Sequence, residues 1–318
     1  MLYRKIFVAF VATLLLATST CVAAKSEVID VEVVTPEINF RGDVTFARYF
    51  TWPQSNLKMD IYFHDGKEKS PAVIFVPGGW WITSPKEAGN PLTSQLAQAG
   101  FAVASIEYRH IVDATYVDII GDVKAAVRYL RAHADEFNID KDKIAIMGAS
   151  AGGYLAIMVG VTGGVAKFDF GDNLDQSSEV QAVVDIFGPS DLTKIAADYS
   201  KDVQDLYNSP GGAVALLVNG MAGFKGRKGG ALRDTPETAR DSNPLTYINK
   251  NTPPFLIMHG NADKTISPSQ SKILHDALIK HGVESEHYIL DGVGHDFRYF
   301  FQPKTFGIIV DFLNRALR

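Results

Sequence analysis

Short apolar runs alternate with segments of helical periodicity along most of the chain. Residues 72–76 and 144–147 are unbroken apolar runs, which are typical of strands buried on both faces of a sheet. Between them, residues 117–137 place Val123 and Val127 at helical spacing. The same alternation predicts further strands at 101–106, 180–187, 254–258 and 286–290, and helices at 88–98, from 154 onward, at 268–281 and at 305–317. The pattern indicates an α/β fold with a mostly parallel central sheet and helices on both faces.

The first strands expected in the chain have a different pattern. Residues 28–34, 44–49 and 57–63 alternate apolar and polar positions, which is typical of half-exposed strands. A turn-forming sequence, His64 to Lys67, follows the third of them. We expect these strands to form an antiparallel edge of the sheet.

One long segment, residues 194–249, does not fit the alternation. It is rich in glycine and weakly periodic, with short helices expected at 198–209 and 213–219. A structureless loop of this length is unusual inside a compact domain. We therefore expect a partial lid over the carboxyl edge of the sheet, with a surface excursion as the alternative. Since composition does not change abruptly, residues 25–318 are predicted to form one domain.

The first 24 residues have the pattern of a signal peptide. Arg4 and Lys5 precede an apolar stretch, and Val22-Ala23-Ala24 forms a small-residue cleavage site. The apolar stretch is too short for a stable membrane span. We expect export to the periplasm or the medium after cleavage near Ala24. A lipid anchor at Cys21, the single cysteine of the chain, is the alternative.

Size and charge limit the remaining classes of function. The chain has 318 residues, of which 46% are hydrophobic, so it can bury a large core. Its formal net charge is −5 and no long basic run is present, which argues against nucleic acid as a partner. The sequence leaves the oligomeric state open.

A candidate nucleophile lies between a predicted strand and a predicted helix. Gly148-Ala149-Ser150-Ala151-Gly152 is a G-x-S-x-G sequence, which can hold a serine hydroxyl above a sheet on a sharp strand-to-helix turn. The pattern alone is weak, but its place after the 144–147 strand strengthens it. The alternative is that Ser150 is a simple helix N-cap.

A serine nucleophile requires a base and an acid, and both can come from loops that follow strands. Asp263 follows the 254–258 strand, and His295 follows the 286–290 strand. Ligands bind at the carboxyl ends of strands in open α/β sheets, and the order serine, aspartate, histidine is that of the α/β-hydrolases. Asp185 and Asp191 remain alternative acids, while His259, before a turn glycine, is expected to pack or bond locally.

The remaining candidate is an oxyanion hole. Pro77-Gly78-Gly79-Trp80 follows the 72–76 strand, where glycines allow backbone N–H groups to point at a carbonyl oxygen. The residue after the candidate nucleophile, Ala151, adds another donor. Trp81 is expected to bind substrate. The alternative is a glycine turn whose two tryptophans only cover the core.

With these residues in place, the chain resembles α/β-hydrolases of the carboxylesterase kind that carry an H-G-G-G-W loop. It is most similar to bacterial feruloyl and acetyl-xylan esterases. The resemblance runs from about residue 60 to 315 and includes, besides the Ser150 turn, the segments 107–109, 122–130, 177–185, 253–257 and 294–295. It implies a catalytic triad of Ser150, Asp263 and His295, with Gly79, Trp80 and Ala151 as oxyanion donors. Pro77 and Trp80 depart from the loop pattern, where the family has histidine and the third glycine.

The predicted function is therefore hydrolysis of short-chain or aromatic acyl esters, with carbohydrate esters as one substrate class, through an acyl-enzyme at Ser150. No metal and no organic cofactor are expected. An amidase or peptidase of the same fold is the nearest alternative. A binding protein that keeps the fold without catalysis is the alternative from another class.

Overall fold

The computed structural model describes residues 26–32, 37–50 and 54–317. The predicted signal peptide, with Cys21, lies outside the described residues. The chain divides into two units, Met1–Thr35 and Pro36–Arg318. In the first unit, residues 26–32 form no helix or strand. The prediction of a strand at 28–34 is therefore wrong for residues 28–32, the part of it that the structure describes.

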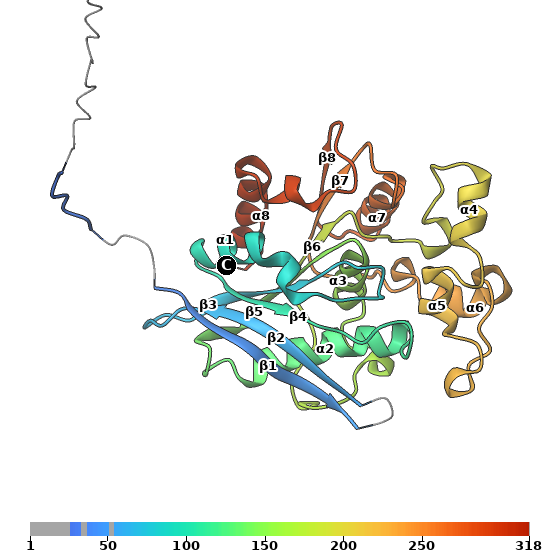
Figure 1. Ribbon diagram of the computed structural model, residues 1–318, viewed down its shortest axis with the longest axis horizontal. Helices are drawn as coiled ribbons and strands as arrows, with labels where there is room; N and C mark the ends of the chain where they lie inside the picture. Colours follow the sequence, from blue (N-terminus) through green and yellow to red (C-terminus); the bar gives the residue numbers. More distant parts are fainter. Residues whose placement is uncertain (1–25, 33–36, 51–53, 318) are drawn as a thin grey trace, which may run out of the picture. The chain divides into compact units, whose positions relative to one another are not determined.

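In the second unit, an 8-stranded sheet has the order β1-β2-β4-β3-β5-β6-β7-β8 (Figure 1). The strands are β1 (Asn39–Tyr49), β2 (Ser55–Phe63), β3 (Ser70–Val76), β4 (Ala102–Ile106), β5 (Ile139–Ala149), β6 (Ala182–Ile186), β7 (Phe255–Gly260) and β8 (Ser285–Leu290). β2 pairs antiparallel with both β1 and β4, whereas all pairs from β4 to β8 are parallel. The predicted mostly parallel sheet with an antiparallel edge is confirmed.

Helices cover both faces of this sheet, as predicted. They are α1 (Asn90–Gln98), α2 (Tyr116–Ala132), α3 (Ala151–Val161), α7 (Ser269–Lys280) and α8 (Pro303–Ala316). Neighbouring residues of β3 belong to different cores: Val73 lies in the cluster that includes side chains of α1 and α8, and Ile74 in the cluster that includes side chains of α2, α3 and α7. β3 is buried on both faces for this reason, which explains its unbroken apolar sequence.

Residues 194–249 contain three short helices, α4 (Lys201–Tyr207), α5 (Ala213–Asn219) and α6 (Pro236–Asp241). Figure 1 shows them, in yellow to orange, grouped apart from α1 and α8. The first two lie within the helices expected from sequence. Among the described residues, no helix combines the length and the apolarity that crossing a membrane requires.

The turn between β5 and α3 places Ser150 at the carboxyl edge of the sheet. Ser150 has φ 57° and ψ −122°, a conformation that L-residues rarely adopt. The surrounding backbone is too close for side chains. A Cβ on Gly148 would lie 2.1 Å from the carbonyl oxygen of Gly152, and a Cβ on Gly152 would lie 2.0 Å from that of Val76. The two glycines of the motif are therefore required by packing.

This packing predicts a stability difference between two glycine substitutions. Gly152→Ala is expected to lower the free energy of unfolding by about 1–3 kcal/mol, because its Cβ collides with backbone that has little room to move. Gly307→Ala, in α8, is the matched control: its Cβ meets no atom within 4 Å, and it should be neutral or stabilising by up to about 1 kcal/mol. Urea denaturation measures both. Equal stability of the two variants would contradict the packing argument.

Candidate active site

Three side chains from distant parts of the sequence meet at the carboxyl edge of the sheet. Ser150 follows β5, Asp263 lies in the loop after β7, and His295 lies in the loop after β8. Nε2 of His295 is 2.9 Å from Oγ of Ser150. Nδ1 of the same ring is 2.6 Å from Oδ2 of Asp263. The structure therefore brings the predicted nucleophile, base and acid into one hydrogen-bonded chain.

Asp263 is buried but well supplied with hydrogen-bond donors. Its Oδ1 accepts from the backbone N–H groups of Thr265 (2.7 Å) and Ile266 (3.1 Å). Burial alone raises the pKa of this carboxyl, but hydrogen bonds from His259, His295 and the Thr265 backbone outweigh burial and hold the pKa well below its ordinary value. An ionised Asp263 is suited to fix the orientation and tautomer of an imidazole.

The loop after β3 supplies backbone donors beside Ser150. A Cβ on Gly78 would lie 3.1 Å from Cβ of Ser150, so this loop runs directly against the serine. Within the described residues, the backbone N–H groups of Gly79, Trp80 and Ala151 have no protein acceptor. Unpaired N–H groups beside a serine hydroxyl are the arrangement that an oxyanion hole requires.

The two tryptophans of this loop have different surroundings. Trp81 is 1% exposed, and its Nε1–H donates to the carbonyl oxygen of Ala151 at 3.0 Å. Its side chain is not open to a substrate, contrary to the expectation from sequence. It ties the loop to the first residue of α3. Trp80 is only partly buried and packs against Tyr207 of α4, with 5.7 Å between ring centroids.

An apolar cavity begins at Trp80. It has a volume of about 400 Å³. One wall is formed by Trp80 and Ile82, and the other by the α4–α5 region, with Leu206, Tyr207 and Val214. The cavity therefore joins the loop beside Ser150 to the 194–249 segment.

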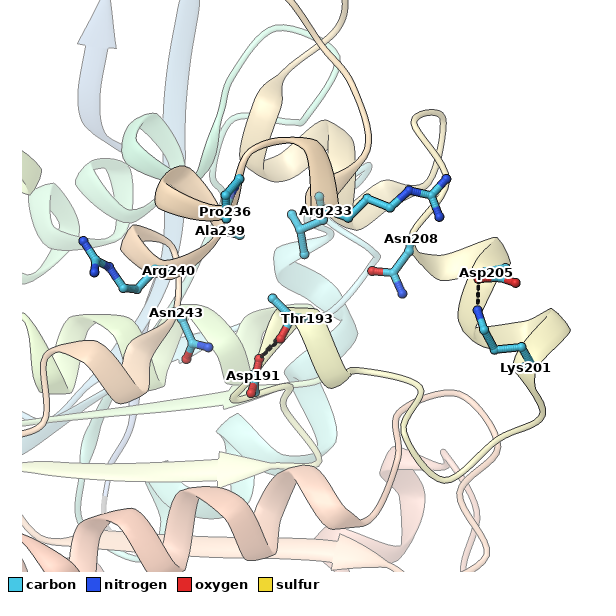
Figure 2. A pocket seen from close by; sticks show the side chains of 11 residues that line it. Asp191, Thr193, Lys201, Asp205, Asn208, Arg233, Pro236, Ala239, Arg240 and Asn243 are labelled. Atoms are coloured by element: carbon cyan, nitrogen blue, oxygen red, sulfur yellow. Dashed lines mark hydrogen bonds and ion pairs between the residues drawn. The ribbon is translucent and has the colours of Figure 1, made fainter.

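The alternative acid Asp191 lies in a different cavity, most of whose lining residues are polar or charged. Figure 2 shows this cavity, of about 500 Å³, between the segment after β6 and the helices α4 and α6. Asp191 accepts hydrogen bonds from the backbone and hydroxyl of Thr193, at 3.1 and 2.6 Å, and pairs with Lys194 at 3.2 Å. These contacts stabilise a local turn. The structure joins His295 to Asp263 instead.

The other alternative acid, Asp185, is completely buried in β6. Its Oδ1 accepts from the backbone N–H of Gly188 at 2.9 Å, and its Oδ2 has no partner among the described residues. Burial raises the pKa of this carboxyl well above its ordinary value, against a smaller lowering by the Gly188 hydrogen bond. Asp185 packs behind the Ser150 turn, where a Cβ on Gly153 would come within 2.5 Å of its Oδ1.

One residue that contacts the candidate acid, His259, was not assigned to the site from the sequence. Nε2 of His259 lies 3.2 Å from Oδ2 of Asp263, the same oxygen that His295 contacts. His259 does bond to a residue close to it in the sequence, as expected, but that residue is the candidate acid. The spacing of four residues, His259 to Asp263, with a glycine turn between them, is the only signal that sequence offered.

Across the described residues, no cluster of three or more histidine, cysteine, aspartate or glutamate side chains could hold a metal ion. The side chains and backbone groups of the site can themselves supply a reaction. A serine hydroxyl can attack a carbonyl carbon when an imidazole accepts its proton and a carboxylate stabilises the resulting imidazolium. Backbone N–H groups can stabilise the oxyanion that forms.

The sheet, the turn at Ser150 and the order of the three side chains define an α/β-hydrolase. The chain belongs to the BD-FAE family, whose family model matches residues 59–278. The resemblance predicted from sequence is thereby confirmed.

Curated relatives of the chain are ester hydrolases by name. It is 31% identical over 246 residues to a probable carboxylic ester hydrolase, LipM, and 30% identical over 230 residues to the esterase LipC, both of Mycobacterium tuberculosis. These matches cover 74% and 72% of this chain, but only 51% and 53% of the relatives. The chain thus spans about half the length of the curated relatives it matches.

Solved structures give the same class over most of the chain. A truncated carbohydrate esterase from gut microbiota is 29% identical with a TM-score of 0.74, and the match covers 87% of this chain and 96% of the other. The bifunctional GH43-CE protein of Bacteroides eggerthii is 30% identical with a TM-score of 0.76, over 88% of this chain and 35% of the other. An esterase of Thermogutta terrifontis, at 22% identity and a TM-score of 0.66 over 89% and 92% of the two chains, supports the fold alone.

The burial of Asp185 predicts a pH-dependent gain in stability for Asp185→Asn. Because burial raises the pKa of this carboxyl, the folded state keeps it protonated to a higher pH than the unfolded chain, which ionises it above a pH of about 4. The wild type therefore loses stability as pH rises from there to the raised folded-state pKa, by about 1.4 kcal/mol per pH unit. Asparagine keeps an acceptor for Gly188 and does not ionise. Urea denaturation should give nearly equal stabilities at pH 4 and a more stable variant at pH 8; a constant difference between the two pH values would contradict a raised pKa.

Proposed function

We propose that the protein is a serine carboxylic ester hydrolase. The observation that supports this most directly is the continuous hydrogen-bonded chain from Ser150 through His295 to Asp263, with 2.9 and 2.6 Å between the bonded atoms. The names of its relatives agree with this class of reaction.

In the proposed reaction, Oγ of Ser150 attacks the ester carbonyl carbon while Nε2 of His295 accepts the hydroxyl proton. The N–H groups of Gly79, Trp80 and Ala151 bind the oxyanion, and each such donor contributes about 3–4 kcal/mol to transition-state stability. His295 then gives its proton to the leaving alcohol. Water, deprotonated by the same nitrogen, releases the acid from the acyl-enzyme, and Ser150 recovers its proton.

We propose that the apolar cavity beside Trp80 receives the acyl group of the ester. Its Trp80 wall belongs to the loop that would hold the carbonyl oxygen, so a chain or ring attached to the carbonyl carbon lies within its reach. The structural relatives named as carbohydrate esterases suggest a sugar as the alcohol. A sugar is too polar for an apolar cavity, which leaves the cavity for a short-chain or aromatic acyl group.

Two further proposals follow from the sequence. The N-terminal pattern supports export to the periplasm or the medium. The position of α4 and α5 along the apolar cavity supports a role of residues 194–249 as a partial lid.

The nucleophile is tested by Ser150→Ala. Loss of Oγ should lower kcat for 4-nitrophenyl acetate by about 10⁴-fold or more, since no other group can form the acyl-enzyme. A fluorophosphonate should label wild-type Ser150 with loss of fluoride, which peptide mass spectrometry detects, and should leave the variant unlabelled. Retained esterase activity in the variant would refute the serine mechanism. Turnover of peptide amides but not esters by the wild type would favour the amidase alternative, and binding of acetylated xylan without turnover would favour a binding protein.

The acyl cavity is tested by Leu206→Arg. Leu206 is 67% exposed on the cavity wall, and Leu174, 59% exposed outside that cavity, provides a matched control. Arginine at position 206 should reduce kcat/KM for a feruloyl ester about ten-fold, because it places a charge where an apolar ring would bind. For the acetyl ester, kcat/KM should change less than about two-fold. In Leu174→Arg, kcat/KM for both esters should also change less than about two-fold. Equal losses on both acyl groups would place the feruloyl ring elsewhere.

A further inference from the structure

His259 and Ser271 lie behind the candidate acid, away from solvent. His259 is the penultimate residue of β7 and is 1% exposed, and Ser271 in α7 is fully buried. Nδ1 of His259 is 2.7 Å from Oγ of Ser271. Nε2 of His259 is 3.2 Å from Oδ2 of Asp263. One carboxylate oxygen therefore contacts two imidazoles, of which His295 is the other.

The direction of these hydrogen bonds follows from the partners. Nε2 of His259 faces two groups that can only accept, the ionised carboxylate of Asp263 and the carbonyl oxygen of Ile266 at 3.3 Å. Nε2 must therefore carry a hydrogen. In the neutral ring, Nδ1 is then an acceptor, and the Ser271 hydroxyl donates to it. By donating to Nδ1, the Ser271 hydroxyl stabilises the tautomer of His259 that donates to Asp263.

We propose that His259, whose Nδ1 accepts from Ser271, is a positioning residue for Asp263 that adjusts how strongly this carboxylate holds a proton on His295. This inference rests on the proposed function. The two serine–histidine pairs share one oxygen: Ser150 and His295 on the solvent-accessible side, Ser271 and His259 in the interior. The interior pair has no access to substrate.

Two effects follow from the shared oxygen. Oδ1 is fixed by two backbone N–H groups, so the second donor on Oδ2 completes the restraint on the carboxylate plane. The hydrogen bond from His259 also neutralises part of the charge on Oδ2, which weakens the attraction of Asp263 for a protonated His295. Removing the donor should therefore favour protonated His295, the form that cannot act as a base. The acidic limb of the pH–rate profile would move to higher pH.

Other titratable groups surround His259 and must be separated from it. Asp263 and His295 contact it as described. The backbone carbonyl of Asp263 accepts from the Tyr199 hydroxyl at 3.2 Å. His287 of β8 lies near, and burial, His275, His259 and Lys272 together lower its pKa. On α7, His275 bonds Ser285 and Lys272 pairs with Asp276. Among these groups, His287 is the one whose titration could be confused with that of His295 in a pH profile.

The experiment compares full pH profiles of kcat/KM for 4-nitrophenyl acetate. His259→Leu removes the donor, His259→Gln keeps an N–H at the place of Nε2, and His287→Gln is the control on a neighbouring, half-buried histidine. For His259→Leu we expect a loss of about ten-fold or more in kcat/KM. KM should change by less than about three-fold, and the acidic limb should move up by about half a pH unit or more. His259→Gln should have nearly the wild-type kcat/KM and nearly the wild-type position of the acidic limb. His287→Gln should leave the acidic limb where it is in the wild type.

Circular dichroism melting separates this role from a structural one. The proposal would be overturned if His259→Leu keeps the wild-type acidic limb and a near-normal kcat/KM, even when its melting temperature is lower. It would also be overturned if His259→Gln is as impaired as His259→Leu. If His259→Leu does not fold, Ser271→Ala decides. It removes the hydroxyl that donates to Nδ1 of His259 and should move the limb in the same direction by a smaller amount, and an unmoved limb would overturn the proposal. Failure of the proposed function is recognised separately, by activity that survives Ser150→Ala.

Discussion

The backbone bend at Ser150 is the constraint on which the site depends. The residue is held at φ 57° while Gly148 and Gly152 approach neighbouring backbone too closely for any side chain. A strained residue persists only where its surroundings fix it. Here the N–H of Ser150 donates to Ile186 in β6, and the ring of Trp81 holds the residue that follows, Ala151. The bend is thus fastened to the neighbouring strand and to the loop that runs against the serine.

Much of this arrangement could be predicted because it depends on local patterns. Buried parallel strands must be apolar on both faces, so 72–76 and 144–147 stood out, and residues after such strands must meet at one edge. The segment 28–32 shows the limit: alternation is a weak signal when no partner strand is known. Trp81 shows another, since sequence does not tell whether a large aromatic residue faces the core or the ligand.

His259 could not be assigned from sequence for a related reason. A histidine at a strand end has several ordinary uses, and only the coordinates show that its ring reaches the same oxygen as His295. Asp185 is similar. Its place near the end of a buried strand suited a catalytic acid, but whether a carboxyl is ionised depends on the donors around it. Asp263 has four polar contacts to its two oxygens, whereas Asp185 has one backbone donor in an apolar setting.

The apolar cavity has walls of separate origin. One belongs to the loop after β3, close to the reacting atoms, and the other to α4 and α5, inserted far along the chain between β6 and β7. Changes in the inserted helices can alter the width and polarity of the cavity without moving the strands that hold serine, aspartate and histidine. In the proposed reaction, acyl selectivity and reactivity thus depend on different stretches of the polypeptide. Related proteins with different inserted helices can therefore accept different acyl groups and still carry out the same reaction.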